Sequence, residues 1–376
     1  MIAQPLNPTE NQEWLRGLKQ RAAHLRVPLR GMLELTSRCN LRCVHCYLGS
    51  QDEQHARREE EMSTERVKSL IDEIIKAGCL YLTITGGDPM MRRDFREIYT
   101  YARVQGLLVT VFCDAILVTD KILELFKAYP PRMVEVSIYG ATAPTYERVT
   151  RVPGSFPKAL EGIRALIDHG IRVRLKTVLM ELNKHEIHEM EGIAVHLGVP
   201  FRFDSAIFPC LPQGSEEAGT ENDHAPLDLR VSPQEVVDIE LASPERRRHW
   251  REAYGKASAL PETDRLYSCG AGQTSFYVDP YANVSPCLMT SMHRHSLEGT
   301  TFRERWDNDL VKIREKKRSP DAKCAVGGMR GLCTACPGAN YLETGDENHE
   351  SEYSRQIAEL RYNAIVNEDR VAPKGA

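Results

Sequence analysis

Six short apolar segments alternate with amphipathic segments between residues 31 and 207 of this 376-residue chain. Each apolar segment is rich in β-branched or aromatic residues and has the length of a buried strand. The segments are 31–36, 81–85, 107–112, 133–138, 172–178 and 201–207. The intervening segments have helical periodicity, as in STERVKSLIDEIIKAG, where Val67, Leu70 and Ile74 share one face. This alternation favours a parallel sheet flanked by helices.

Consecutive strand–helix units imply parallel strands joined by right-handed crossovers. We therefore expect the α/β class, with a partial (β/α)6 TIM-like barrel whose functional groups gather at the C-terminal ends of the strands. The charged run at 51–61 is expected to be a solvated loop. The expected domains are an N-terminal lead-in at 1–30, the barrel at 31–210, a linker at 211–268 with one or two helices, a small cysteine-rich domain at 269–345, and a C-terminal helix and tail at 346–376.

Charge and hydropathy argue against nucleic-acid and membrane partners. The formal net charge is −4, and Lys and Arg are spread along the chain. No run of about 18 apolar residues is present, and the start of the chain lacks the pattern of a secretion signal. We therefore expect a cytoplasmic protein. Because the cytoplasm keeps thiols reduced, its 11 cysteines are not expected to form disulfides. Eight of them are clustered, three within 39–46, two at 269 and 287 and three within 324–336, and these are expected to bind metal.

The segment LELTSRCNLRCVHCYLG places Cys39, Cys43 and Cys46 directly after the first expected strand. A [4Fe–4S] cluster normally takes four thiolates, so three leave one iron open to a substrate or cofactor. A compact loop also surrounds a cluster with backbone N–H groups, which favour its negative charge. The alternatives are a zinc site and reduced core cysteines.

This Cys-x3-Cys-x-aromatic-Cys pattern resembles the signature of the radical S-adenosylmethionine (SAM) superfamily, with His45 in the aromatic place. The resemblance implies that SAM chelates the open iron through its amino and carboxylate groups. One electron from the cluster then cleaves the sulfonium to methionine and a 5′-deoxyadenosyl radical, which abstracts a hydrogen atom from the substrate. A reduced flavodoxin or ferredoxin is the implied electron donor.

The resemblance also implies contacts to SAM. The TGGDP segment at the end of the second strand matches the family's Gly-Gly-acid motif, so Gly86, Gly87 and Asp88 are expected to bind the SAM ammonium.

Further contacts are expected at other strand ends. Ser137 is expected near the ribose or carboxylate of SAM, and either Arg148 or Arg151 near its carboxylate. Further candidates for contact with substrate or SAM are Lys176, Asn183 and Asp204, with Cys113 and Cys210 at the rim.

Five further cysteines lie toward the C-terminus, namely Cys269, Cys287, Cys324, Cys333 and Cys336. Their spacing resembles the SPASM or shorter twitch extension of the same superfamily, which holds auxiliary [4Fe–4S] clusters. Gly327 stands where that extension has a cysteine, and no cysteine follows Cys336. Two clusters need eight thiolates, so we expect one auxiliary cluster on four of the five. A second, cysteine-poor cluster and a structural zinc ribbon are the alternatives.

The resemblance covers about residues 31–340 and favours a peptide-modifying enzyme, since members with this architecture commonly modify ribosomal peptides or proteins. Residues 1–30 are too short for a fused leader-binding domain, so a separate leader-recognition protein is an expected partner. The enzymatic alternative is a small-molecule, tetrapyrrole or other cofactor substrate. The alternative from another class is a non-catalytic zinc-binding interaction protein.

Overall fold

The computed structural model describes residues 8–211, 226–259, 263–320, 329 and 331–367. Its described strands form one sheet in the order β6-β5-β4-β3-β2-β1-β7-β8-β9. The strands are β1 Arg30–Glu34, β2 Tyr81–Thr85, β3 Leu108–Cys113, β4 Met133–Ser137, β5 Val173–Val178, β6 Phe201–Asp204, β7 Ser275–Val278, β8 Asn283–Ser285 and β9 His295–Ser296.

The six strands expected from the apolar segments are all present, and each is parallel to the next in sequence. The sheet does not close on itself, since β6 lies at one edge. The expected α/β partial barrel is therefore confirmed. All six strands point the same way, so their C-terminal ends meet at one edge of the sheet.

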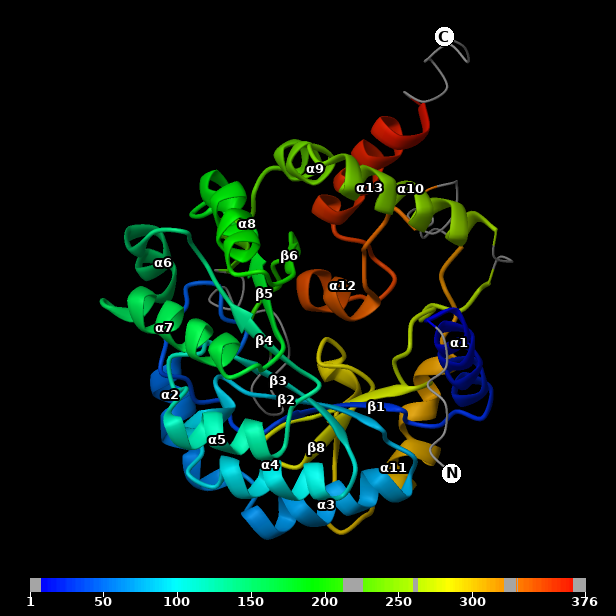
Figure 1. Cartoon of the computed structure of the whole chain (residues 1–376). Coiled ribbons are helices and arrows are strands. Elements are labelled where there is room, and N and C mark those ends of the chain that lie inside the picture. The colour runs from blue at the N-terminus through cyan, green and yellow to red at the C-terminus, as the bar shows by residue number, and fades with distance from the viewer. Residues whose placement is uncertain (1–7, 212–225, 260–262, 321–328, 330, 368–376) are drawn as a thin grey trace.

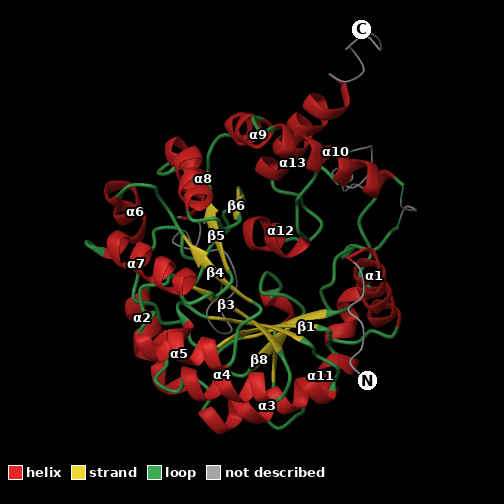
Figure 2. Cartoon of the chain, viewed as in Figure 1, coloured by secondary structure: helices red, strands yellow, loops and turns green. Residues whose placement is uncertain are grey.

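Helices surround this sheet (Figures 1 and 2). They are α1 Pro8–His24, α2 Gln51–Ala56, α3 Thr64–Lys76, α4 Phe95–Val104, α5 Asp120–Ala128, α6 Ala143–Thr150, α7 Ser155–Asp168, α8 Ile187–His196, α9 Pro233–Leu241, α10 Pro244–Ser258, α11 Phe302–Asn308, α12 Pro337–Thr344 and α13 Glu352–Tyr362. Figure 1 shows α3 to α8 outside the barrel strands, while α9, α10 and α13 lie together beyond β6.

Helix α3 illustrates how the local sequence sets these elements. Ser63 caps its N-terminus by accepting a hydrogen bond from the Arg66 N–H at 3.2 Å. The predicted apolar face, including Val67 and Leu70, is fully buried against the sheet. The helix ends before Gly78, whose φ of +106° is a conformation that favours glycine.

Strand β7 joins the barrel sheet rather than forming a sheet of its own. It is parallel to β1, with Arg30 opposite Ser275, and β8 and β9 follow as antiparallel strands. Behind it, the backbone N–H of Phe302 in α11 donates to Glu73 of α3 at 2.6 Å. The expected cysteine-rich domain thus begins on the barrel sheet, and its division from the barrel stays a prediction.

The prediction of a solvated loop at 51–61 is wrong, because the segment forms α2 and a 3₁₀ turn over residues 57–60. Within α2, the side chains of Gln51 and Gln54 are buried. The Gln51 side chain accepts from the Cys39 N–H at 2.6 Å, and Gln54 donates to the Leu48 carbonyl at 2.7 Å. Two glutamines therefore fold a charged segment back onto the cysteine loop.

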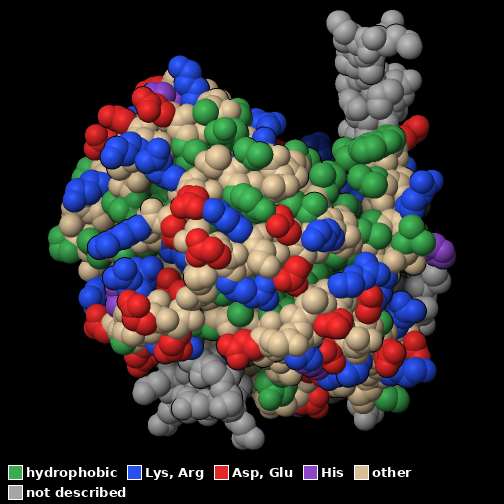
Figure 3. Space-filling model, turned by 90° about the horizontal axis from the view of Figure 1, so that it is seen from below, with side chains coloured by type: hydrophobic (Ala, Val, Ile, Leu, Met, Phe, Trp, Pro, Cys, Tyr) green, Lys and Arg blue, Asp and Glu red, His purple; other side chains and the backbone are tan. Residues whose placement is uncertain are grey.

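On the face seen in Figure 3, acidic and basic side chains are interspersed, and neither sign dominates. None of the described helices is both long and apolar enough to cross a membrane.

Candidate active site

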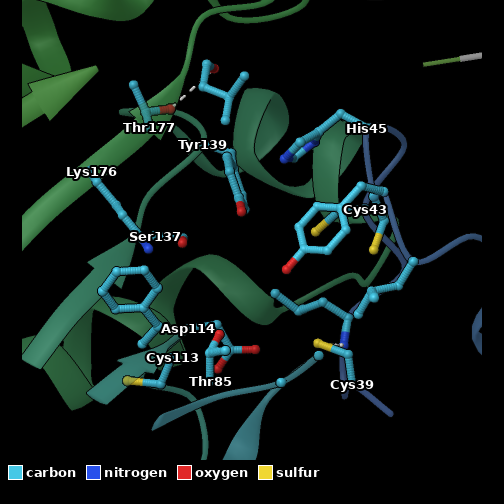
Figure 4. Close-up of a pocket in the computed structure, with 18 of the residues that line it drawn as sticks. Cys39, Cys43, His45, Thr85, Cys113, Asp114, Ser137, Tyr139, Lys176 and Thr177 are labelled. Atoms are coloured by element: carbon cyan, nitrogen blue, oxygen red, sulfur yellow. Dashed lines mark hydrogen bonds between the residues drawn. The ribbon is translucent and has the colours of Figure 1, made fainter. Parts of the chain in front are cut away.

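A cavity of about 290 Å³ lies at the C-terminal ends of the parallel strands (Figure 4). Five barrel strands contribute to its wall, because parallel strands end at the same edge. Their contributions are Thr85, Gly86 and Gly87 after β2, Phe112, Cys113 and Asp114 at β3, Ser137 and Tyr139 at β4, Lys176, Thr177 and Val178 at β5, and Arg202 and Asp204 at β6.

The loop after β1 completes the cavity and brings all three predicted cysteines to its wall. Two backbone hydrogen bonds tie this loop to the end of α6: Arg42 N–H to Thr150 O at 2.9 Å and Val44 N–H to Val149 O at 3.0 Å. Burial raises the pKa of Cys46 to about 11. A positively charged metal centre is what would stabilise such thiols as thiolates.

The three thiols line the wall of one cavity but do not converge on a single point. Within the described ranges, no three His, Cys, Asp or Glu side chains converge closely enough to hold one metal ion. A polynuclear cluster takes its thiolates at separate irons and needs no such convergence.

His45 lines the cavity with the three cysteines, and its expected role beside the cofactor stays a prediction. Its ring packs edge-on against Tyr139, with the ring centroids 4.6 Å apart (Figure 4). Burial lowers the pKa of His45 to about 4, so the imidazole is neutral near pH 7. Its Nδ1 atom is buried and has no hydrogen-bond partner among the described residues.

The two glycines of TGGDP let the β2 loop approach the cysteine loop. The Gly87 N–H donates to Thr36 O at 2.8 Å, and the Asp88 N–H donates to Arg38 O at 2.9 Å. A Cβ atom on Gly86 would lie 2.5 Å from Thr36 O, and one on Gly87 would lie 2.6 Å from Ser37 O. Any side chain here would push the two loops apart.

Asp88 is fully buried and does not line the cavity. Its carboxylate accepts from the Met90 N–H at 2.8 Å and from the Asp114 N–H at 3.0 Å. The expected contact between Asp88 and SAM stays a prediction. The geometry does not favour it, because the Asp88 carboxylate does not reach the cavity wall.

Sequence reasoning missed Asp114, which follows β3 and lines the cavity. Its Oδ1 atom accepts from the Ile116 N–H at 2.8 Å, and its side chain also interacts with those of Asn40 and Asp88. Burial raises the pKa of both Asp88 and Asp114. The strand-end rule that selected Ser137 could have identified Asp114, had it been applied to the third strand.

Of the remaining candidates, Ser137, Asp204, Cys113 and Lys176 line the cavity. The Lys176 ammonium lies 3.2 Å from the centroid of the Phe112 ring. Burial lowers the pKa of Lys176 to about 7.

Other candidates lie outside the cavity. Arg148 and Arg151 are exposed and do not line it. Asn183 is fully buried, and its amide donates to Tyr139 O at 3.2 Å and Val178 O at 3.0 Å, which ties the ends of β4 and β5 together. The Cys210 thiol lies 3.6 Å from the Cys46 carbonyl oxygen, behind the cysteine loop.

A second cavity, of about 280 Å³, contains Cys269, Cys333 and Cys336. Burial first, and then the nearby Cys336 and Cys269 thiols, raise the pKa of Cys287 to about 11. Four predicted auxiliary ligands are therefore neighbours. Cys324 and Gly327 lie outside the described residues.

Glu347 lines the same cavity and gathers a polar network beneath the cysteines. It accepts from Tyr267 Oη at 2.5 Å, from His293 Nε2 at 2.7 Å and from Lys316. The pKa of Glu347 is about 2, because these hydrogen bonds outweigh the opposing effect of burial.

The first cavity fits an iron–sulfur cluster with a bound cofactor. Three thiols on the single loop after β1 line it, a fourth thiol, Cys113, lines it from β3, and the glycine pair holds two loops at backbone contact. The three thiolates of one loop provide the donor set for a cluster with one open iron.

Comparison with known proteins agrees with this chemistry. Residues 33–194 match the family described as the Radical SAM superfamily. The AdoMet-dependent heme synthase of Methanosarcina barkeri is 28% identical over 85% of this chain and 94% of that protein. The antilisterial bacteriocin subtilosin biosynthesis protein AlbA of Bacillus subtilis is 29% identical over 70% of this chain and 55% of that protein.

The fold has solved counterparts. Streptococcus suis SuiB bound to S-adenosylmethionine matches 94% of this chain and 82% of its own, with a TM-score of 0.64 and 14% identity. SuiB has also been solved with its precursor peptide SuiA. The likeness to SuiB concerns the fold alone, whereas the family match and the sequence relatives concern the chemistry. The chain is therefore a radical SAM enzyme, a member of the superfamily that uses a [4Fe–4S] cluster and SAM.

Proposed function

We propose that Cys39, Cys43 and Cys46 hold the [4Fe–4S] cluster, that SAM binds in the adjoining cavity, and that the enzyme modifies a peptide or protein. The observation that carries this proposal is the gathering of three thiols and several polar strand-end side chains around one cavity of about 290 Å³. When bound, the cluster and SAM supply a radical that abstracts hydrogen from the substrate.

The chain's own residues hold, orient and shield the reactants. His45, Tyr47 and Tyr139 add aromatic surface beside the thiols, which limits the access of water. Because His45 is neutral, it would add no positive charge to the cavity when the positively charged SAM binds there. Lys176, with a pKa of about 7, can hold or release a proton near neutral pH.

A peptide or protein is the first candidate substrate. The bacteriocin biosynthesis protein AlbA and SuiB, solved with a precursor peptide, point to the same substrate class.

A tetrapyrrole is the second candidate substrate, because the heme synthase of Methanosarcina barkeri is matched over 94% of its length. Only the substrate differs between the two candidates, so both need the same three cysteines and the same SAM site.

Two partners belong to this proposal. A reduced flavodoxin or ferredoxin would supply the electron, and a separate leader-recognition protein would present the peptide. We place the reaction in the cytoplasm, where thiols stay reduced.

The test is turnover by the anaerobically reconstituted protein with SAM and dithionite. We expect 5′-deoxyadenosine to form, and its yield to rise when a peptide encoded beside the gene is added and changes mass. The Cys43→Ala variant is the control. Turnover of a tetrapyrrole, with no change in any such peptide, would instead identify the second candidate.

A further inference from the structure

We propose that the Lys176 ammonium, with Arg202 beside it, binds a carboxylate of the substrate, namely the side chain of a glutamate or aspartate in the peptide. The inference rests on the proposed function and deepens it, because it names the chemistry of the residue that enters the cavity. It concerns the part of the cavity wall that β5 and β6 form.

Lys176 brings a cationic side chain to the cavity from the end of β5. Figure 4 shows it across the cavity from Cys43. Its ammonium lies 3.2 Å from the centroid of the Phe112 ring and forms no hydrogen bond or ion pair with the described residues. Neither Asp114 nor Asp204, the carboxylates in the cavity wall, is paired with it. An anion that enters the cavity can therefore reach this ammonium.

The acidic residue that most favours the charged form of Lys176 is already neutralised by arginines. Burial lowers the pKa of Lys176 to about 7, and the charge of Glu135 offsets only part of that effect. The neighbouring Arg202 lowers this pKa further, and Cys113 raises it. The two oxygens of Glu135 accept from Arg174 at 3.1 Å and from Arg202 at 3.0 Å. A partly buried ammonium is costly without a counterion, so this site favours an anionic ligand.

Arg202 places a second cation next to Lys176. The two residues are opposite each other in the parallel pairing of β5 with β6, and both line the cavity. One Arg202 nitrogen holds Glu135, while the guanidinium has five N–H groups in all. An ammonium and a guanidinium donate hydrogen bonds and cannot accept them, so the pair suits a carboxylate better than a neutral amide.

The carboxylate of SAM is the rival ligand. Chelation of the open iron would place that carboxylate beside the cysteine loop, whereas Lys176 lies across the cavity from Cys43 (Figure 4). SAM also brings a positively charged sulfonium into the cavity. A substrate carboxylate would be attracted by the sulfonium and by Lys176 together, and a basic substrate group would be repelled by both.

The test measures equilibrium binding of two probes to the anaerobically reconstituted protein loaded with SAM. The probes are N-acetylglutamate amide and its neutral counterpart, N-acetylglutamine amide. At pH 6, wild type should bind the glutamate probe roughly 10- to 100-fold more tightly, as expected for a hydrogen bond between charged groups. This preference should shrink as the pH rises from 7 to 9, because only the protonated ammonium attracts the carboxylate.

Three variants separate charge from structure. Lys176→Met should lose most of the preference and of its pH dependence, while binding SAM as tightly as wild type. Lys176→Arg should keep the preference up to pH 9, because a guanidinium stays charged. Arg174→Gln is the matched control: Arg174 lies two positions earlier on β5 and also holds Glu135, but it does not line the cavity. It should keep the full preference. Iron content and thermal stability are measured for every variant.

Equal binding of the two probes by wild type, or binding of neither, overturns the inference without any variant, so a poorly folded Lys176→Met protein does not leave it undecided. A preference that Lys176→Met retains, or that Arg174→Gln loses, also overturns it. Weaker binding of SAM by folded Lys176→Met would assign Lys176 to the SAM carboxylate instead.

All of these outcomes leave the proposed function intact as long as wild type binds and cleaves SAM. Binding of coproporphyrin that depends on Lys176, with neither probe bound, would assign the carboxylate to a tetrapyrrole and overturn the peptide substrate as well. Failure of wild type to bind SAM at all overturns both the inference and the proposed function.

Discussion

Gly87→Ala should destabilise the protein and disturb the cysteine loop, although it adds a single methyl group. The new Cβ atom would lie 2.6 Å from Ser37 O and closer still to Arg38 O. Both obstacles are backbone atoms, so no side chain can rotate away. The segment that leads into Cys39 must retreat by about half an ångström or more.

The magnitude follows from these contacts. Overpacking of this kind costs about 1–3 kcal/mol. The shift also strains two hydrogen bonds between the loops, Gly87 N–H to Thr36 O at 2.8 Å and Asp88 N–H to Arg38 O at 2.9 Å, each worth about 1 kcal/mol. We expect a loss of about 2–4 kcal/mol, a large fraction of the roughly 5–15 kcal/mol that stabilises a folded protein.

The assay is anaerobic thermal unfolding together with iron content after reconstitution. Gly192→Ala is the matched control, because it lies inside α8 with nothing within 4 Å of the added Cβ. It should stabilise the protein slightly, by about 0.5–1 kcal/mol, through helix propensity. If Gly87→Ala unfolds at the wild-type temperature and loads the full amount of iron, then Gly87 is not required for the close approach of the two loops.

Three further predictions concern the metal sites and the cavity. Cys43→Ala should abolish 5′-deoxyadenosine formation under dithionite, and a normal yield from soluble protein would contradict the cluster assignment. Wild type should hold about eight irons, and replacing Cys39, Cys43 and Cys46 together should leave about four; retained zinc without iron would contradict an auxiliary cluster. Burial lowers the pKa of Lys176 from 10.5 to about 7, so the unfolded chain binds this proton more tightly. Lys176→Met should therefore raise the free energy of unfolding by about 1–3 kcal/mol at pH 6, after allowance for partial exposure. This gain should shrink as the pH rises from 7 toward 10.5, and equal gains at pH 6 and pH 10 would refute the reasoning.

Much of the fold could be predicted from sequence because its signals are local. The apolar segments predicted the bounds of β1 to β5 within two residues, whereas β6 ends at Asp204, three residues before the expected end. Their alternation with helices predicted the parallel pairing. The three cysteines were found because their spacing is short and they directly follow a strand. Such features depend on residues a few positions apart, so no tertiary contact is needed to recognise them.

Charge composition misled the prediction for residues 51–61. The run is strongly polar, yet Gln51 and Gln54 turn inward to hold the backbone of the cysteine loop. Hydrogen-bond partners 6 and 12 residues away decided the outcome, and average polarity carries no information about them.

By itself, the sequence determined the order of strands and helices, the edge of the sheet where chemistry occurs, and the cysteines after β1. Tertiary structure alone decided that β7 pairs with β1 and which strand-end side chains face the cavity. Asp88 and Asp114 make the difference plain. A motif singled out Asp88, but its carboxylate accepts the Asp114 N–H across 26 positions of sequence and stays out of the cavity wall, which Asp114 lines instead. Local periodicity fixes which side of a strand is buried, whereas the partner of each buried polar atom depends on the packing of distant segments.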